Sequence, residues 1–357
     1  MTAGWLKSRI EGAMYGGAIG DALGRPVEGM ARNLIEEIYG LREVTDMMPR
    51  IKKDKDGNLK EQAQPGQTTD DTHFKNLLCQ AILKKGGRVD AEAFAKELTV
   101  DDKFAYLVMR MALLKQELLR KNYTANSYAQ SHMPVIDTAA HHGGQGLPPA
   151  NGAVMMISPV GMLYPGQPHE AYLAGYEIAC AIQQGYSADM AGVVAAGVAA
   201  ALTLDARPAT VVNTMMEYAP VNAKALLTAT LELVDQSADM PAFREAYHDK
   251  LLIHFLDPGE VVAAAAAGLL LGDGDFEKST LNAVNFGRDT DSIATITGAL
   301  AGALGGISAI PDKWIKAVDD SIKDEPLQSD MAAGVFKALQ FELNGAREWA
   351  DSYTALL

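Results

Sequence analysis

Apolar residues recur at helical spacing along most of this chain. In residues 189–204 (DMAGVVAAGVAAALTL) and 293–304 (IATITGALAGAL), small and aliphatic side chains return every three or four positions, as in buried helices. Alternating β-branched runs, the pattern of strands, are almost absent. One short hairpin is predicted around residues 51–60, where Asp56-Gly57 gives a turn signal between two arms. The pattern therefore predicts an all-α fold, a compact bundle of helices with at most a small hairpin.

Two glycine-rich stretches add to this picture. Gly298 and Gly302 lie four apart on one face of a predicted helix, where the missing side chains would let another segment approach the backbone closely. Residues 16–24 (GGAIGDALG) are also dense in glycine, but they lack the G-x-G-x-x-G spacing and no strand pattern precedes them, which argues against dinucleotide binding. Neither a linker nor a repeat divides the chain, so we expect one domain over residues 1–357.

Charge and cysteine usage narrow the classes of protein. With 31 Lys+Arg against 45 Asp+Glu the chain carries a formal charge of −14, which argues against nucleic-acid or anionic-membrane binding, because both rest on clustered basic charge. Cys79 and Cys180 each lie within an apolar helical pattern, which favours a reducing cytoplasm over a disulfide framework. The longest apolar run, residues 261–271, is far shorter than the ~20 residues that span a bilayer. We therefore expect a cytoplasmic protein without a nucleic-acid or membrane partner.

Two acidic clusters each stand directly before a predicted apolar helix. The first is TDDT at residues 69–72, before a helix over 73–83, and the second is GRDTDS at residues 287–292, before a helix over 293–305. Helix capping explains each cluster taken alone, because Thr and Asp satisfy unpaired N–H groups and complement the helix dipole. Each cluster also brings two carboxylates and a hydroxyl together, however, and carboxylates that share a cleft require protonation or a cation.

A pair of divalent cations is the alternative to capping. The candidate ligands are all oxygen donors, namely the side chains of Thr69, Asp70, Asp71, Asp289, Asp291 and Ser292. Oxygen donors favour Mg²⁺, Mn²⁺ or Ca²⁺ over zinc, and two divalent ions would balance the charge of the four carboxylates. Two such ions roughly 3.5–4 Å apart would form a binuclear hydrolytic centre, provided that the two clusters converge in space.

Two further segments carry candidate site residues. Glu28 follows Pro26 and is expected on a loop, where a carboxylate can serve as a gate or a general base or can simply face solvent. Residues 141–149 (HHGGQGLPP) form the least helical stretch, and loops of this composition can present backbone N–H groups to a ligand.

Four motifs in register resemble the ADP-ribosylglycohydrolase family. They are GGAIGDALGRPVE at residues 16–28, TDDT at 69–72, NGAVMMISPVG at 151–161 and GRDTDSIATITGALAGALGG at 287–306, with matching order and spacing across nearly the whole chain. The resemblance implies an orthogonal helical bundle of that family's type and two Mg²⁺ or Mn²⁺ ions in a central cleft. It also implies hydrolysis of the glycosidic bond at C1 of an ADP-ribosyl ribose.

The resemblance also assigns roles to individual residues. The metal ligands would be the six oxygen donors named above. We expect the catalytic residues to be Glu28, Asp70 and Asp289, and the sequence leaves open which aspartate assists the reaction, because carboxylates that share metal ions titrate together. Glu28 falls where the family places a loop carboxylate that closes over the substrate ribose, and it would orient or deprotonate the attacking water. The substrate diphosphate would rest on a loop that corresponds to Gly143, Gly144, Gln145, Gly146, Asn151 and Gly152.

Departures from the family pattern keep three functions open. Met156 stands where many members carry arginine, Ser292 where threonine is common, and Gln183 and Gln184 where many members carry a histidine on a helix. The expected function is removal of ADP-ribose from a protein side chain, above all arginine. The first alternative is a hydrolase of a small N-ribosyl metabolite, and the second is a non-catalytic ADP-ribose-binding protein, against which the complete ligand set argues. The Ala-rich helix surfaces predict no particular oligomeric state.

Overall fold

The computed structural model describes residues 3–53, 57–100, 140–322, 326–354 and 356. Its helices are α1 (Ala3–Gly24), α2 (Arg32–Tyr39), α3 (Asp70–Lys85), α4 (Ala91–Val100), α7 (Ser158–Met162), α8 (Pro168–Ala179), α9 (Tyr186–Ala201), α10 (Pro208–Tyr218), α11 (Val221–Gln236), α12 (Met240–Lys250), α13 (Pro258–Leu271), α14 (Phe276–Phe286), α15 (Thr290–Gly305), α16 (Asp312–Ser321) and α17 (Gln328–Thr354). Short 3-10 segments are η1 (Arg25–Val27), η2 (Ala140–His142), η3 (Asn151–Ala153) and η4 (Ile307–Ala309). The all-α prediction is confirmed.

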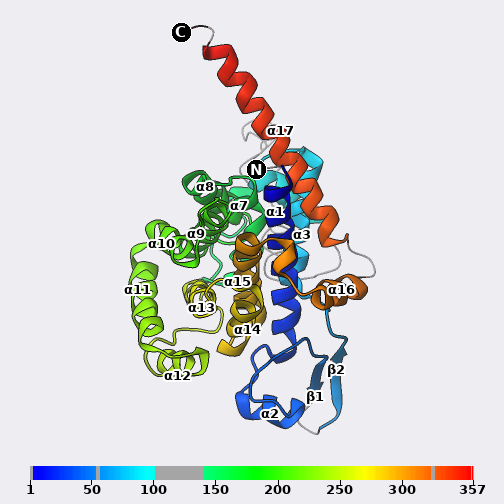
Figure 1. Cartoon of the computed structure of the whole chain (residues 1–357), viewed down its shortest axis with the longest axis vertical. Coiled ribbons are helices and arrows are strands. Elements are labelled where there is room, and N and C mark those ends of the chain that lie inside the picture. Colours follow the sequence, from blue (N-terminus) through cyan, green and yellow to red (C-terminus); the bar gives the residue numbers. More distant parts are fainter. Residues whose placement is uncertain (1–2, 54–56, 101–139, 323–325, 355, 357) are drawn as a thin grey trace, which may run out of the picture.

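The predicted hairpin is present, and in the described part of the chain it is the sheet of the fold. Strands β1 (Arg50–Lys53) and β2 (Leu59–Ala63) pair antiparallel and lie beside α2 at one end of the molecule (Figure 1). The predicted turn residue Asp56 lies outside the described residues, whereas Gly57 has a φ of 83°.

Helices α1 and α15 pack face to face through their glycines. A Cβ built on Gly298 would lie 2.1 Å from the carbonyl oxygen of Gly16, and one built on Gly302 would lie 2.0 Å from that of Gly12. The predicted close approach at Gly298 and Gly302 is therefore present, and its partner is the other glycine-rich stretch. The contact brings the start of α15 against the end of α1, where the Thr290 hydroxyl donates to the carbonyl of Gly24 at 2.8 Å.

The Ala-rich helices form the centre of the bundle. Helix α13, which contains the longest apolar run of the chain, is buried from Pro258 to Leu269, and α9 is buried along most of its length. In Figure 1, α13 lies between α15 and α11, which forms the outer side together with α10 and α12. A helix that is apolar all round is typical of such a central position. Among the described helices, none combines the length and hydropathy needed to cross a membrane.

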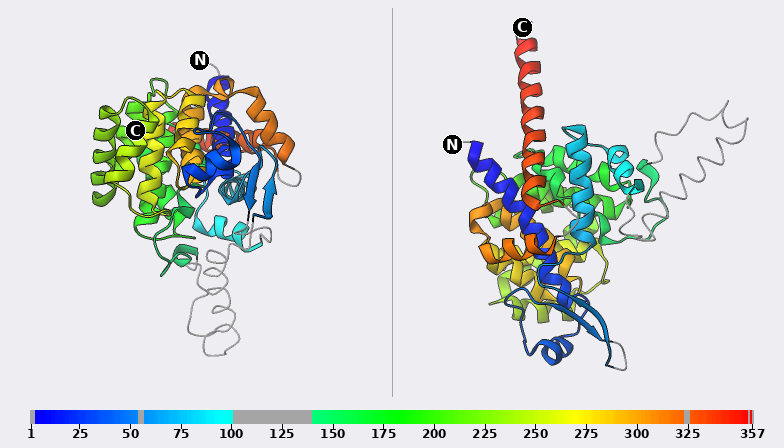
Figure 2. Two further views of the ribbon diagram at one scale, coloured as in Figure 1. Left: turned by 90° about the horizontal axis from the view of Figure 1, so that it is seen from below. Right: turned by 90° about the vertical axis from the view of Figure 1, so that its right-hand side faces the viewer.

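Helix α17 projects beyond the body of the molecule. Its first half packs against α1 and α3 and buries residues such as Val335 and Leu339. Its second half extends away from the other helices (Figure 2), and Gly345 there has no heavy atom within 4 Å of a Cβ built on it.

Candidate active site

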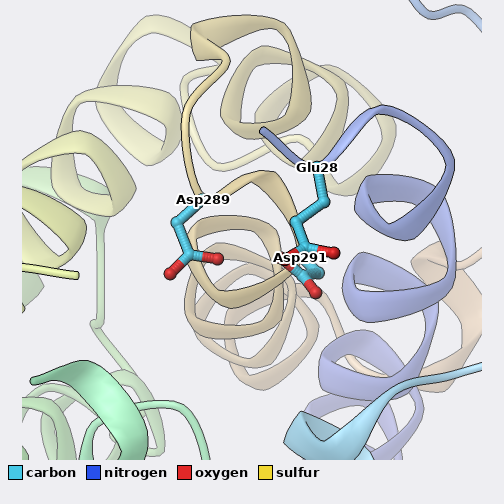
Figure 3. A group of neighbouring side chains, drawn as sticks. All are labelled: Glu28, Asp289 and Asp291. Atoms are coloured by element: carbon cyan, nitrogen blue, oxygen red, sulfur yellow. The ribbon is translucent and has the colours of Figure 1, made fainter. Parts of the chain in front are cut away.

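Three carboxylates from two distant parts of the chain come together. The carboxylate oxygens of Glu28, Asp289 and Asp291 lie within 4.8 Å of one another. Glu28 follows η1 at the end of α1, as the sequence predicted, and the two aspartates stand at the start of α15 (Figure 3). Both aspartates are buried, whereas Glu28 is partly exposed.

The start of α15 does not use its acidic residues as caps. The helix begins at Thr290, three residues before the predicted start, after a turn in which Arg288 has a φ of 65°. Asp289 occupies the N-cap position, but its side chain makes no capping hydrogen bond. Its carboxylate instead accepts from the amide of Asn151, which also donates to the Ser292 hydroxyl at 3.1 Å. Asn151 was predicted to bind substrate, and its side chain here orients the acidic cluster.

The start of α3 combines capping with a second acidic pair. Thr69 is the N-cap of α3, and its hydroxyl accepts from the backbone N–H of Asp71 at 3.3 Å. The Thr69 hydroxyl also lies 3.2 Å from Asp71 Oδ2. Helix α3 begins at Asp70 rather than at His73, so both aspartates lie in its first turn. Helix capping therefore describes Thr69 but not Asp289.

Asp21 is a site residue to which the sequence analysis assigned no role. It is fully buried in α1, and its carboxylate accepts hydrogen bonds from the backbone N–H of Thr69, the backbone N–H of Thr72 and the Thr72 hydroxyl, at 2.6–3.1 Å. It thus fixes the first turn of α3 against α1. The signal in the sequence was an aspartate that follows nine uncharged residues within an apolar helix.

The two acidic pairs and Asp21 act on one another electrostatically. Burial, followed by repulsion from Asp21, raises the pKa of Asp70 to about 7. Burial raises the pKa of Asp289 to about 6. The pKa values of Asp71 and Asp291 are also raised, by burial first and then by neighbouring carboxylates that include Asp289 in both cases. The convergence on which the metal hypothesis depends is therefore present in the structure.

The donors fit a hard divalent cation. Within the part of the chain that the structure describes, Asp71 Oδ1 and Asp291 Oδ1 are buried without a hydrogen-bond partner. Buried charged oxygens are normally paired or coordinated to a metal. The surrounding donors are carboxylate and hydroxyl oxygens, the chemistry that Mg²⁺ and Mn²⁺ prefer.

The glycine-rich loop is largely bonded to the protein itself. The backbone N–H groups of Gly143, Gly144 and Gln145 donate to the carbonyls of Ala140, Cys180 and His142, respectively, at 3.0–3.2 Å. Asn151 and Gly152 lie in the first turn of η3, where N–H groups have no partner within the helix. In this conformation the start of η3 therefore has more donor capacity for a diphosphate than the first part of the loop.

Two departures from the family pattern lie at buried positions. Met156 is fully buried among the hydrophobic residues of the core. Helix α8 ends at Ala179, so Gln183 and Gln184, which correspond to a helical position in many family members, lie beyond the helix here. The Gln183 backbone donates to the carbonyl of Ala179 and continues the chain as a turn.

The raised pKa values predict how stability depends on pH when divalent ions are chelated. The folded protein holds protons on Asp70 and Asp289 up to about pH 7 and 6, whereas the unfolded chain releases them near 3.8. This contribution to the free energy of unfolding is fully present below pH 3.8 and is lost as the pH rises through 6 and 7.

Urea unfolding in EDTA at several pH values between 4 and 8 checks this expectation. We expect Asp70→Asn to lose less stability than the wild type over that interval, because it removes one of the carboxyl groups whose pKa is raised on folding. If the free energy of unfolding depended on pH equally in the two proteins, the raised pKa of Asp70 would be contradicted.

Comparisons with known proteins identify relatives of this chain in sequence and in fold. Residues 3–342 match the ADP-ribosylglycohydrolase family. An ADP-ribosyl-dinitrogen reductase glycohydrolase of Rhodospirillum rubrum is 25% identical over 329 residues, which cover 91% of this chain and 95% of the relative. The ADP-ribosylarginine hydrolase Tri1 of Pseudomonas putida (strain GB-1) is 33% identical over 116 residues, which cover 28% of this chain and 31% of the relative. A solved structure described as an ADP-ribosylglycohydrolase-related protein complex shares the fold, with a TM-score of 0.61 and 22% identity over 94% of this chain and 98% of that one.

Proposed function

The chain belongs to the ADP-ribosylglycohydrolase family, and from this premise we propose that it hydrolyses the bond between ADP-ribose and a modified protein side chain, with ADP-ribosyl-arginine as the substrate class. The family and the hydrolases among its relatives make the chain a glycohydrolase. The choice of arginine follows the name of the Pseudomonas putida relative. The substrate, the number of metal ions and the residue roles below are parts of the proposal.

The observation that carries the proposal is the buried acidic cluster with its two unpaired oxygens. Asp71 and Asp291 each contribute one such oxygen, and their carboxylates come from the first turns of α3 and α15. The arrangement raises the pKa of four aspartates and is therefore unfavourable for stability. Clusters of ionisable groups with strongly shifted pKa values are found most often at functional sites.

The cofactor in this proposal is a pair of Mg²⁺ or Mn²⁺ ions. They would be held by the six predicted oxygen donors, Thr69, Asp70, Asp71, Asp289, Asp291 and Ser292. When bound, such ions supply Lewis-acid activation of water and orientation of the substrate. Glu28 was expected to act in catalysis, and its position within 4.8 Å of Asp289 and Asp291 oxygens also suits a ligand role.

The chain's own residues account for the proton and charge requirements of the reaction. Glu28 and Asp70 are the partly exposed carboxylates among these residues, and Glu28, on the loop after η1, can orient or deprotonate a water arriving from solvent. Asp70 has a pKa of about 7 in the metal-free protein, so an ion that binds there at neutral pH would displace its proton. Asp289, fixed by Asn151, places negative charge where the oxocarbenium-like ribose develops positive charge.

Backbone donors suit the anionic half of the substrate. The chain carries a charge of −14, so a diphosphate is better accommodated by N–H groups than by a basic patch. The first turn of η3, with Asn151 and Gly152, provides such groups beside Asp289.

Hydrolysis of an arginine-linked substrate tests the proposal. The full chain with Mn²⁺ or Mg²⁺ is incubated with a protein ADP-ribosylated on arginine, and released ADP-ribose is measured by chromatography. We expect turnover that EDTA abolishes and that Asp289→Asn lowers more than ~100-fold, beyond the ~10–100-fold loss typical of groups that only orient metal ligands. The matched control is Asp239→Asn, which changes an exposed N-cap aspartate of α12 to an equally good cap and should leave the rate unchanged.

The rival functions give different outcomes. Hydrolysis of a small N-riboside without hydrolysis of the arginine-linked substrate would replace the proposal by the small-metabolite alternative. Calorimetric binding of ADP-ribose without turnover on either substrate would indicate a non-catalytic binding protein. Failure to bind ADP-ribose, in a protein that takes up two divalent ions, would overturn the ADP-ribose specificity.

A further inference from the structure

Arg50 lies against Glu28 from a different part of the fold. It is the first residue of β1, and its Nη1 donates to Glu28 Oε2 at 3.0 Å and to the backbone carbonyl of Arg25. Its Nε lies 3.3 Å from a carboxylate oxygen of Glu61 on β2. The Arg50 side chain is 9% exposed and that of Glu28 is 34% exposed. A buried cation is thus paired with a carboxylate that remains open to solvent.

A second arginine connects the same segment to the start of α3. Arg25 Nη1 donates to the carbonyl of Thr68 at 2.9 Å, and Arg25 Nη2 donates to Glu61 at 3.3 Å. Glu61 is therefore shared by Arg25 and Arg50. Thr68 directly precedes Thr69, the N-cap of α3. The hairpin, the Glu28 segment and the first turn of α3 are joined by one network of charged groups.

Tyr39 adds an uncharged connection between the hairpin and this segment. Its hydroxyl donates to the carbonyl of Pro26 at 3.3 Å and accepts from the backbone N–H of Ile51 at 3.1 Å. Ile51 is the neighbour of Arg50 on β1. The strand that carries Arg50 is thus held against the turn that carries Glu28.

The position of Glu28 requires such a support. Like charges repel one another at the separation of the Glu28, Asp289 and Asp291 oxygens, and a partly exposed carboxylate can relieve that repulsion by turning into solvent. Arg50 opposes this movement, because its guanidinium donates both to the Glu28 carboxylate and to a backbone carbonyl of the same segment. A planar group with several fixed donors is suited to such two-point binding, whereas an ammonium group is not.

We propose that Arg50 is a positioning residue for this reaction, which holds the Glu28 carboxylate at the acidic cluster, and that the β1–β2 hairpin serves as its support. The inference rests on the proposed function, in which Glu28 acts at the substrate ribose. Arg50 acts through Glu28 and needs no contact with the substrate.

A double-mutant cycle tests the proposal. The full chain with Mn²⁺ is compared with Arg50→Met, Glu28→Gln and the double variant on the arginine-linked substrate. We expect Arg50→Met to lower kcat by about 10- to 100-fold, with KM changed by less than about threefold. The double variant should be no more than about twofold slower than Glu28→Gln alone. Arg50→Lys should restore part of the rate, because it keeps the charge without the two-point grip.

A matched control separates positioning from general destabilisation. The side chain of Arg244 on α12 is 7% exposed, pairs with Glu43 at 3.3 Å and donates to the carbonyl of Asn285. It resembles Arg50 in burial and in its type of partners. In the Arg244→Met/Glu28→Gln double variant, the fold-losses in kcat of the two single variants should multiply. If the fold-losses of Arg50→Met and Glu28→Gln also multiplied in their double variant, the proposal would be overturned.

A second cycle, on folding stability, keeps failure of this inference distinct from failure of the proposed function. Urea unfolding of the same four proteins in EDTA measures the Arg50–Glu28 coupling without any substrate. We expect a coupling of at least about threefold in the unfolding equilibrium constant. A wild type inactive on every substrate would overturn the proposed function, and absence of coupling would overturn the role of Arg50 even in an active enzyme.

Discussion

Replacing Gly298 by alanine is expected to lower the free energy of unfolding by about 3 kcal/mol, near the upper end of the usual effect of overpacking. The new Cβ would lie 2.1 Å from the carbonyl oxygen of Gly16. The obstruction is backbone of α1, so no flexible side chain can move aside, and the two helices must separate. Thermal or urea unfolding in the presence of saturating Mn²⁺ measures the loss.

Gly345 provides the matched control for this substitution. It also lies within a helix, the projecting part of α17, but a Cβ built there meets no heavy atom within 4 Å. Gly345→Ala should therefore stabilise the protein slightly, by up to ~1 kcal/mol, because alanine favours the helix. If Gly298→Ala also proved neutral or stabilising, the close backbone contact of α1 and α15 at their glycines would be contradicted.

Replacing Asp291 by asparagine is expected to separate function from stability. The variant should lose more than ~100-fold in turnover, because it removes a proposed metal ligand rather than a group that only orients one. In EDTA the same variant should be more stable than the wild type, because burial and the neighbouring carboxylates raise the pKa of Asp291 and its charge opposes folding. Activity assays and urea unfolding of the same preparation check both expectations.

Whether Asp291→Asn raises or lowers the free energy of unfolding in EDTA decides whether the buried carboxylate needs a cation. Asp239→Asn, the exposed cap of α12, should change neither activity nor stability and serves as the reference. An Asp291→Asn variant that is less stable than the wild type in EDTA would show that the buried carboxylate is compensated within the protein. The case for a divalent cation at this position would then fail.

Much of the helical fold could be predicted because helices depend on the spacing of residues that are close together in the sequence. The Ala- and Leu-rich periodicity predicted the helical bundle, and the spacing of Gly298 and Gly302 predicted a close helix contact. The starts of α3 and α15 were predicted three residues late, because Asp70 and Thr290 belong to the first helical turn although their polar side chains interrupt the apolar pattern. Capping residues locate the start of a helix only to within a few residues.

The acidic cluster could be predicted in composition but not in arrangement. Two acidic pairs before two helices are visible in the sequence, whereas their convergence depends on the packing of α1 against α15. Asp21 and Arg50 could not be assigned because their contacts also join residues that are distant in the sequence. Their partners, Thr69 and Glu28, lie 48 and 22 positions away, and nothing in the local spacing connects them.

The packing of α1 against α15 also sets the order in which the site can be completed during synthesis. The hydrogen bond from Thr290 to Gly24 joins residues 266 positions apart. At ~5–20 residues per second, a ribosome needs roughly 15–50 s to cover that distance. Through this interval the glycine face of α1 lacks the helix that packs against it. A nascent chain that stops before α15 therefore has half of the acidic centre and lacks the helix that packs on the glycine face of α1, so the enzyme becomes functional only near the end of translation.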